Sequence, residues 1–225
     1  MRLLHGKPLA EKLRNRSRER SAALAARGIA PRLAVVSVGI DPAANTYLQR
    51  LAAHGKKLDI AVDEVDLAGD TPERQLVATL ERLGADSRIN GILLLTPLPG
   101  ALDEGHIVDH IVPAKDVEGM NPWSVGLLAD GRPRFVPSTA EAVVELLKFH
   151  GVPLRGARAT VIGRSTVIGR PAAYLLLKED ATVTIAHRQT RDIRAVTKDA
   201  SVIVVGVGRP GFLSGDMISP GATVI

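Results

Sequence analysis

One segment of this chain is expected to form a buried strand, a glycine-bearing turn and a helix, in that order. The strand is expected at 157–162 and the helix at 170–178. Pro171 fits the first helical turn, where its missing N–H costs no hydrogen bond. The turn between them begins at Gly163 and ends at Gly169. Such a unit aims backbone N–H groups and the positive end of a helix dipole at one place, which predicts a site for a phosphate-bearing cofactor.

Strands and helices alternate along the rest of the chain, which predicts an α/β fold with mostly parallel sheets. In the first half, helices are expected at 6–26, 42–57 and 71–83 (capped by Thr71), and strands at 32–38, 61–67 and 91–96. In the second half, a helix is expected from Ser138 or Thr139 to His150, and strands at 157–162, 181–186, 201–207 and 221–225.

The stretch 116–137 is rich in Gly, Pro and short polar pieces, which is typical of a loop or linker. We therefore predict two domains, residues 1–136 and residues 137–225, the second being a Rossmann-type dinucleotide-binding domain. The glycine spacing in its first turn departs from the usual G-x-G-x-x-G pattern. Because the chain ends inside a predicted strand, we also expect the working protein to be longer at its C-terminus.

Composition narrows the class of protein. The chain has 225 residues, 45% of them hydrophobic, which is typical of a globular protein. No apolar run approaches the ~20 residues of a membrane span, and no secretory signal is recognisable. The net charge of +5 with 3% aromatic residues argues against a nucleic-acid partner, and the basic cluster at 12–20 is expected to be a solvated helix face. These features predict a cytoplasmic protein without membrane or nucleic-acid partners.

Six short segments occur in an informative order. They are Ile92–Pro99 (I-L-L-L-T-P-L-P), Lys115–Gly119 (K-D-V-E-G), Pro137–Thr139 (P-S-T), Gly163–Pro171 (G-R-S-T-V-I-G-R-P), Ala181–Thr190 and Val205–Pro210 (V-G-V-G-R-P). Together they resemble the methylenetetrahydrofolate dehydrogenase/cyclohydrolase family of one-carbon metabolism, over essentially the whole chain.

The resemblance implies a folate-binding domain and a Rossmann domain on either side of a cleft, in a homodimer. It implies a hydride transfer from 5,10-methylenetetrahydrofolate to NADP, which gives the 5,10-methenyl cation. A cyclohydrolase step then adds water and gives 10-formyltetrahydrofolate. The cofactor would carry the hydride chemistry, and the protein would supply orientation and electrostatics.

Three catalytic positions of the family differ in this chain. In the family's Y-x-x-x-K segment, Tyr47 is present but Leu51 stands in the lysine position. Leu95 stands where the family has Gln, and Glu118 stands where it has the second Asp of K-D-V-D-G. Leucine can neither activate water nor hold a lysine, so we expect dehydrogenase activity with cyclohydrolase activity weak or lost. Two alternatives stay open: a fully bifunctional enzyme that activates water with another group, and a non-catalytic paralogue that binds folate or nucleotide. His54 shares the helix face of Tyr47, but we expect a surface histidine.

The resemblance also implies the remaining site residues. Folate contacts are expected from Tyr47, Pro97, Leu98 and Glu118, and cofactor contacts from Thr139, Gly163, Arg164, Ser165, Gly169, Arg188, Val207 and Gly208. No acid follows the second Rossmann strand, where Arg188 stands instead, which favours NADP over NAD. For Ser165 a simple helix cap is an equally good interpretation. No metal ligand set is predicted.

Overall fold

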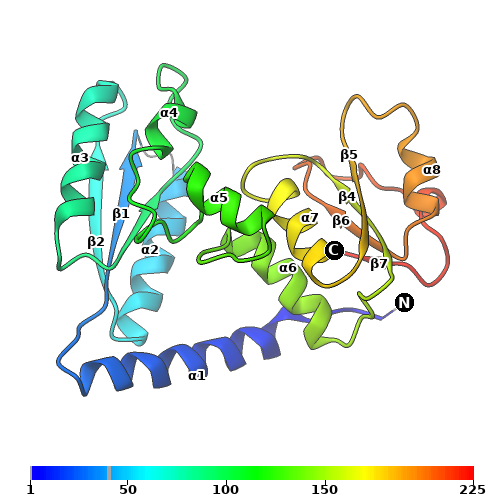
Figure 1. Cartoon of the computed structure of the whole chain (residues 1–225), viewed down its shortest axis with the longest axis horizontal. Helices are drawn as coiled ribbons and strands as arrows, with labels where there is room; N and C mark the ends of the chain where they lie inside the picture. The colour runs from blue at the N-terminus through cyan, green and yellow to red at the C-terminus, as the bar shows by residue number, and fades with distance from the viewer. Residues whose placement is uncertain (1, 40–41) are drawn as a thin grey trace. The chain divides into compact units, whose positions relative to one another are not determined.

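The computed structural model describes residues 2–39 and 42–225 and confirms an α/β architecture with two parallel sheets (Figure 1). The described helices are α1 (Gly6–Ala25), α2 (Pro42–Lys57), α3 (Glu73–Ala85), α4 (Glu104–Val108), α5 (Pro122–Ala129), α6 (Ser138–Phe149), α7 (Gly169–Lys178), α8 (Ile193–Lys198) and the 3-10 turn η1 (Gly215–Met217). The strands are β1 (Arg32–Val38), β2 (Ala61–Leu67), β3 (Gly91–Leu94), β4 (Arg158–Ile162), β5 (Thr182–Ala186), β6 (Val202–Val205) and β7 (Thr223–Val224).

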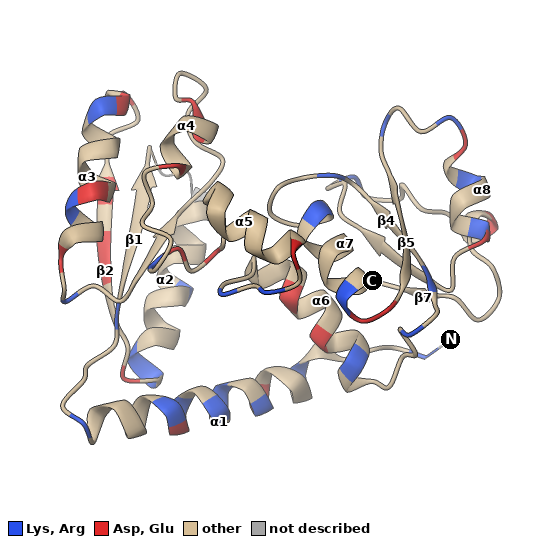
Figure 2. Ribbon diagram, in the orientation of Figure 1, with Lys and Arg blue, Asp and Glu red and all other residues tan. Residues whose placement is uncertain are grey.

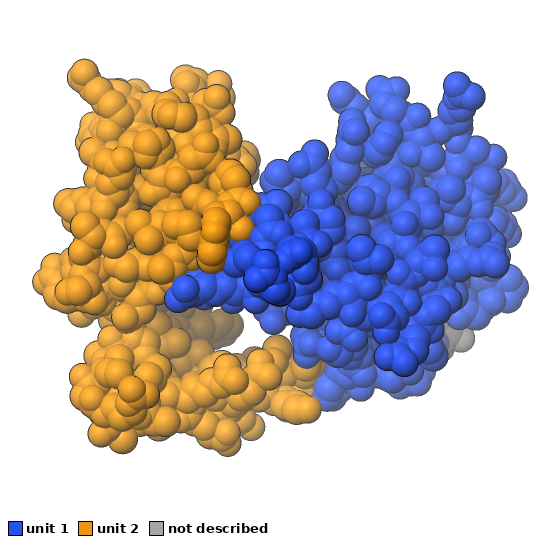
Figure 3. Space-filling view, viewed as in Figure 1, with its two compact units in different colours: residues 1–6, 118–120, 124–225 blue, residues 7–117, 121–123 orange. Residues whose placement is uncertain are grey.

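The chain packs as two compact units, each described by itself below (Figure 3). The N-terminal unit holds residues 7–117 and 121–123, and the C-terminal unit holds residues 1–6, 118–120 and 124–225. Packing thus assigns 124–136 to the C-terminal unit, whereas the sequence predicted a domain boundary after residue 136.

The sheet of the N-terminal unit has the order β2-β1-β3, with every pair parallel. Arg32 lies opposite Ala61, and Leu33 lies opposite Gly91. The central strand β1 is buried over five successive residues, 34–38, as expected of a parallel strand covered on both faces. The loop that leaves β3 carries Pro97 and Leu98, two of the predicted folate-binding residues.

The sheet of the C-terminal unit has the order β5-β4-β6-β7, again all parallel. Because side chains alternate along a strand, Val161 joins the core that β4 shares with α6 and α7, and Ile162 joins a cluster with Ile203 and Ala200. The carboxyl ends of β4, β5 and β6 meet at one edge of the sheet. Three loops of distant sequence are brought together there.

Three short helices, α4, α5 and α8, were not predicted. The prediction of a structureless loop over 116–137 is wrong for Pro122–Ala129, which forms α5. Pro122 is a local signal for the start of this helix, because proline favours the first helical position. However, Gly126 interrupts the apolar run, so the sequence shows no clear helical period there.

The predicted helix caps are also wrong. A proline occupies the N-cap position of both helices, Pro72 before α3 and Pro137 before α6, and neither supplies a side-chain hydrogen bond. Thr71 therefore precedes the cap of α3, while Ser138 is already the first residue of α6.

The basic cluster predicted to be solvated lies along α1 (Figure 2). Its cationic residues Lys12, Arg14, Arg16, Arg18 and Arg20 are all exposed, which confirms that prediction. Among the described residues, no helix combines the length and the apolar character needed to cross a membrane.

Candidate functional site

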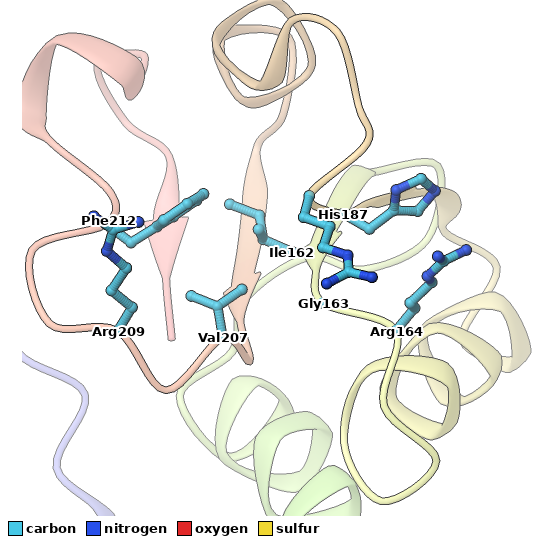
Figure 4. A pocket seen from close by; sticks show the side chains of 8 residues that line it. Ile162, Gly163, Arg164, His187, Val207, Arg209 and Phe212 are labelled. Atoms are coloured by element: carbon cyan, nitrogen blue, oxygen red, sulfur yellow. The ribbon is translucent and has the colours of Figure 1, made fainter.

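A pocket of about 470 Å³ opens at the carboxyl ends of β4, β5 and β6. Its lining comes from three loops: Ile162, Gly163 and Arg164 at the end of β4, His187 and Arg188 after β5, and Val207, Arg209 and Phe212 after β6. Figure 4 shows Arg209 and Phe212 on one side and Arg164 and His187 on the other, with Val207 between them. Ligands of open parallel sheets bind at this edge, where the sequence predicted a cofactor.

Backbone rather than side chain forms part of the pocket wall at Gly163. The φ angle of Gly163 is 120°, a region that other residues rarely adopt. A Cβ atom there would also lie 2.6 Å from the carbonyl oxygen of Gly206, whose N–H donates to the Ile162 carbonyl at 2.8 Å. The close approach of the ends of β4 and β6 therefore requires glycine at position 163.

A second glycine allows α7 to begin against this turn. At Gly169, the first residue of α7, an added Cβ would lie 2.8 Å from the Cα atom of Arg164. The hydroxyl of Ser165 accepts hydrogen bonds from the backbone N–H groups of Ile168 and Gly169, both at 3.2 Å. Ser165 thus acts as a local cap that holds the turn together, and its predicted contact with a cofactor stays a prediction.

The pocket combines an apolar interior with a basic rim. Its rim carries the guanidinium groups of Arg164, Arg188 and Arg209, and no carboxylate is among the lining residues. On the loop after β6, Phe212 and Val207 pack against the apolar cluster of Ile162, Ala200 and Ile203. Apolar contact area with a few convergent cations is suited to an aromatic ring that carries phosphate groups.

The loop after β5 is held in place by local hydrogen bonds. The backbone N–H of His187 donates to the Thr190 hydroxyl at 2.9 Å, and the ring Nδ1 of His187 accepts from the Gln189 N–H at 3.2 Å. Since Nδ1 is an acceptor, the neutral ring carries its proton on Nε2. The position of the adjacent Arg188 is therefore set by a structured turn.

Four predicted cofactor residues line this pocket, namely Gly163, Arg164, Arg188 and Val207. Four others, Thr139, Ser165, Gly169 and Gly208, are not among its lining residues. Sequence reasoning missed the lining residues Ile162, His187, Arg209 and Phe212. The sequence feature that could have identified them is their position, since each lies at the end of a predicted strand or in the loop that follows it.

In the N-terminal unit, the two leucines at the divergent catalytic positions pack against the same apolar cluster. Leu51 on α2 and Leu95 after β3 both pack against one cluster, formed by the buried residues Val35, Leu48 and Leu93. The structure thus brings together two positions that are far apart in sequence. Both contribute apolar surface, so neither leaves a buried polar group in need of a partner.

The other predicted folate residues of this unit lie on the same two segments. Tyr47, one helical turn before Leu51, is 48% exposed. Pro97 and Leu98 follow β3, and the peptide bond between Thr96 and Pro97 is cis. Pro97 is exposed and Leu98 is half-buried. Their predicted contacts with a ligand remain predictions.

Glu118 belongs to the C-terminal unit and contacts the start of α6. One of its carboxylate oxygens, Oε2, accepts a 2.9 Å hydrogen bond from the backbone N–H of Ser138. Pro137 gives α6 no side-chain cap, so this carboxylate supplies an anionic partner at the positive end of the helix. One oxygen of the predicted folate-binding carboxylate is therefore engaged within the protein.

The residues before Glu118 have structural contacts. The ammonium group of Lys115 donates to the carbonyl oxygens of Leu83, Gly84 and Asp86 at the end of α3, at 3.2, 2.6 and 2.7 Å. It therefore satisfies the Leu83 and Gly84 carbonyls in the last turn of α3, which the helix leaves without partners.

The next residue in the loop, Asp116, is buried and accepts the Asn121 N–H at 2.9 Å. The side-chain amide of Asn121 donates to three backbone carbonyls, those of Val108, Asp109 and Ile111. These contacts hold Lys115 and Asp116, the first two residues of the K-D-V-E-G loop, within the N-terminal unit.

Both parts of the chain match models of one known protein family. Residues 4–118 match the family model described as tetrahydrofolate dehydrogenase/cyclohydrolase, catalytic domain, and residues 137–225 match its NAD(P)-binding domain. The chain is 43% identical over 224 residues to a bifunctional protein FolD from Roseiflexus, which covers 99% of this chain and 78% of that protein.

Two solved structures are similar over nearly the whole chain. A bifunctional FolD methylenetetrahydrofolate dehydrogenase/cyclohydrolase from Campylobacter jejuni has a TM-score of 0.96 at 35% identity, covering 100% of this chain and 80% of its own. A Trypanosoma brucei methylenetetrahydrofolate dehydrogenase-cyclohydrolase, complexed with NADP and an inhibitor, has a TM-score of 0.92 at 32% identity, covering 97% and 76%.

Proposed function

The chain belongs to the tetrahydrofolate dehydrogenase/cyclohydrolase family, and on that premise we propose that it oxidises 5,10-methylenetetrahydrofolate with NADP. The observation that carries the proposal is the basic pocket at the carboxyl ends of β4, β5 and β6. Its position and lining suit a phosphate-bearing dinucleotide.

The residues present fit NADP. Gly163 keeps the turn after β4 free of side chain, so that a pyrophosphate can approach the backbone. Arg188 follows the second strand of the sheet, where a Rossmann domain meets the adenosine ribose, and its guanidinium would pair with a 2′-phosphate. Arg164 would add a second cation. When bound, NADP supplies the hydride acceptor, and NAD is the alternative that lacks the 2′-phosphate.

On the folate side, the proposal assigns Tyr47, Pro97 and Leu98 to the pterin-binding surface and Glu118 to a polar contact. Because Oε2 of Glu118 already accepts from Ser138, its other oxygen, Oε1, would be the one to accept from the ligand. Hydride transfer requires orientation more than acid–base chemistry, so these contacts suffice for the dehydrogenase step.

The names of the relatives favour the fully bifunctional alternative over the expectation of a weak or lost cyclohydrolase. The proposal therefore includes hydrolysis of the methenyl product. Leu51 and Leu95 make this step unusual, since neither side chain can activate water or orient a base. Water activation would then depend on other polar groups of the chain.

A single assay tests these alternatives. Purified protein is mixed with 5,10-methylenetetrahydrofolate and NADP, and NADPH and the methenyl product are followed separately by absorbance. NADPH that forms without lasting methenyl supports the bifunctional proposal, whereas NADPH with an equal and persistent methenyl signal shows that hydrolysis is weak or lost. Absence of NADPH formation with NADP and of NADH formation with NAD, while folate and cofactor both bind, would support the non-catalytic alternative and overturn the proposal.

The resemblance carries three further proposals. We expect a homodimer, a cytoplasmic location, and a functional boundary near residue 136 between the folate-binding and NADP-binding parts. Sedimentation velocity tests the first, since a monomer at micromolar concentration would contradict it.

A further inference from the structure

Two histidines lie side by side on the N-terminal unit, each held by its own carboxylate. His106 is in α4, and its Nδ1 contacts Oε1 of Glu73 at 2.6 Å. His110 follows α4, and its Nδ1 contacts Oε1 of Glu81 at 3.0 Å. Both glutamates belong to α3, and the ring centroids of the two histidines are 5.1 Å apart at an interplanar angle of 82°.

The carboxylates determine which ring nitrogen remains available. An ionised carboxylate can only accept a hydrogen bond, so Nδ1 of each ring must carry a proton to donate. In the neutral ring Nε2 then bears a lone pair. A histidine that donates one N–H to a carboxylate and offers the other nitrogen is the usual state of a metal-bound histidine, because the carboxylate fixes the tautomer and raises the basicity of the ligand. His106 and His110 share this state.

The spacing of the two rings matches a shared ligand. His106 and His110 are four residues apart on a helical turn, as are the paired zinc ligands of an H-E-x-x-H helix. Two imidazoles that bind one tetrahedral ion at the usual Zn–N distance have ring centroids roughly 5.2 Å apart. The observed distance between the two ring centroids is 5.1 Å.

We propose that His106 and His110 together bind one Zn²⁺ ion through their Nε2 atoms. Imidazole suits late first-row cations of this kind, whereas Mg²⁺ prefers oxygen ligands. In the described parts of the chain, no group of three or more His, Asp or Glu side chains is placed to hold a metal. The site therefore offers two protein ligands and leaves the other positions to water, which suits the exposure of the two side chains, 56% for His106 and 30% for His110.

The site has a defined place in the fold. Asp103, the N-cap of α4, accepts the N–H of His106, and its own N–H donates to Oε2 of Glu73. Zn²⁺ would therefore bind to a segment whose orientation on α3 is already fixed. This segment connects the Pro97–Leu98 loop to the K-D-V-E-G loop, so the ion would stabilise the connection between them.

Calorimetric titration of the tag-free protein with Zn²⁺ at pH 7.5, with Mg²⁺ as the comparison cation, tests the proposal. We expect one equivalent of Zn²⁺ to bind and Mg²⁺ not to bind. His106→Gln and His110→Gln should each weaken Zn²⁺ binding at least tenfold, while the control His54→Gln, which removes an exposed histidine from α2, should not change it. Glu81→Gln should weaken binding by about tenfold, the lower end of the effect of losing such a carboxylate.

Imidazole NMR spectra of the unmodified chain give an independent readout that needs no variant. Zn²⁺ should shift the Nε2 resonances of two histidines together. Zn²⁺ binding that survives in both histidine variants, a loss in only one of them, or shifts of a single histidine would each overturn the two-histidine site.

Discussion

The carboxylate of Glu118 accepts a 2.9 Å hydrogen bond from the backbone N–H of Ser138, the first residue of α6. A proline precedes Ser138, so the helix receives no cap from its own sequence. An acidic residue twenty positions earlier supplies it instead. The glutamate side chain is one methylene longer than that of aspartate, which extends its carboxylate toward the Ser138 N–H.

Removal of this cap should be measurable. Glu118→Ala should lower the free energy of unfolding by about 1 kcal/mol, the usual effect of losing a helix N-terminal acceptor. Glu118→Gln keeps an acceptor oxygen and loses the charge, so it should lose only a few tenths of a kcal/mol. Urea unfolding of the three proteins checks this order, and equal stability of all three would show that the contact has no energetic role.

Arg188 should determine the choice between NADP and NAD. Arg188→Ala removes a charge-assisted hydrogen bond, which is worth about 1.5–3 kcal/mol, and should raise the KM for NADP roughly 10- to 100-fold. The KM for NAD should change little, because NAD has no 2′-phosphate. Arg155→Ala, which removes a surface arginine paired with Asp180 outside this pocket, is the control. An equal loss with both cofactors would indicate that Arg188 does not contact the 2′-phosphate.

Substitutions at Gly163 and Gly28 allow the cost of backbone strain to be distinguished from the cost of a steric clash. Both have positive φ angles, but an added Cβ at Gly28 meets no atom within 4 Å, while at Gly163 it meets the Gly206 carbonyl at 2.6 Å. Gly28→Ala should therefore lower the free energy of unfolding by about 1 kcal/mol. Gly163→Ala should lower it by more than ~2 kcal/mol and also weaken NADP binding. Equal effects in a urea titration would contradict the close packing of β4 and β6.

The paired leucines allow a test of gained activity. The double variant Leu51→Lys with Leu95→Gln restores a polar pair in the same cluster, and should accelerate methenyl hydrolysis by about 100-fold, the lower end of general acid–base catalysis. Hydride transfer should change little. Leu51→Lys alone should be less stable than the double variant, because its ammonium group would lack a partner. Unchanged methenyl hydrolysis in the double variant would show that these positions do not limit that step.

Much of the fold could be predicted, because strand and helix periods are local properties. The bounds of β1, α2 and β2 agree with the sequence prediction to the residue. Prediction failed at α5 because Gly126 interrupts the apolar run and obscures the helical period. It failed at the cap of α6 because the acceptor, Glu118, lies twenty residues earlier in the chain.

The candidate site divides in the same way. Gly163 and Arg188 were predicted because each follows directly from a strand end. Val207 was predicted from the glycine turn after β6, whereas Arg209 and Phe212, further along the same loop, were missed because no local pattern shows which of its side chains line the pocket. The His106–His110 pair depends on two glutamates some thirty residues earlier, which no spacing rule connects to it.

The parallel order of both sheets has a consequence for synthesis on the ribosome. In each unit the central strand is made first: β1 precedes both of its neighbours, and β4 precedes β5, β6 and β7. The apolar strand β1 therefore emerges with both edges unpaired. β2 can pair with one edge, but the other edge stays unpaired until β3 has left the ribosome, because Leu33 pairs with Gly91. At about 5–20 residues per second, this interval lasts several seconds. During that time an exposed, uncharged stretch of β1 is available to chaperones and to other nascent chains.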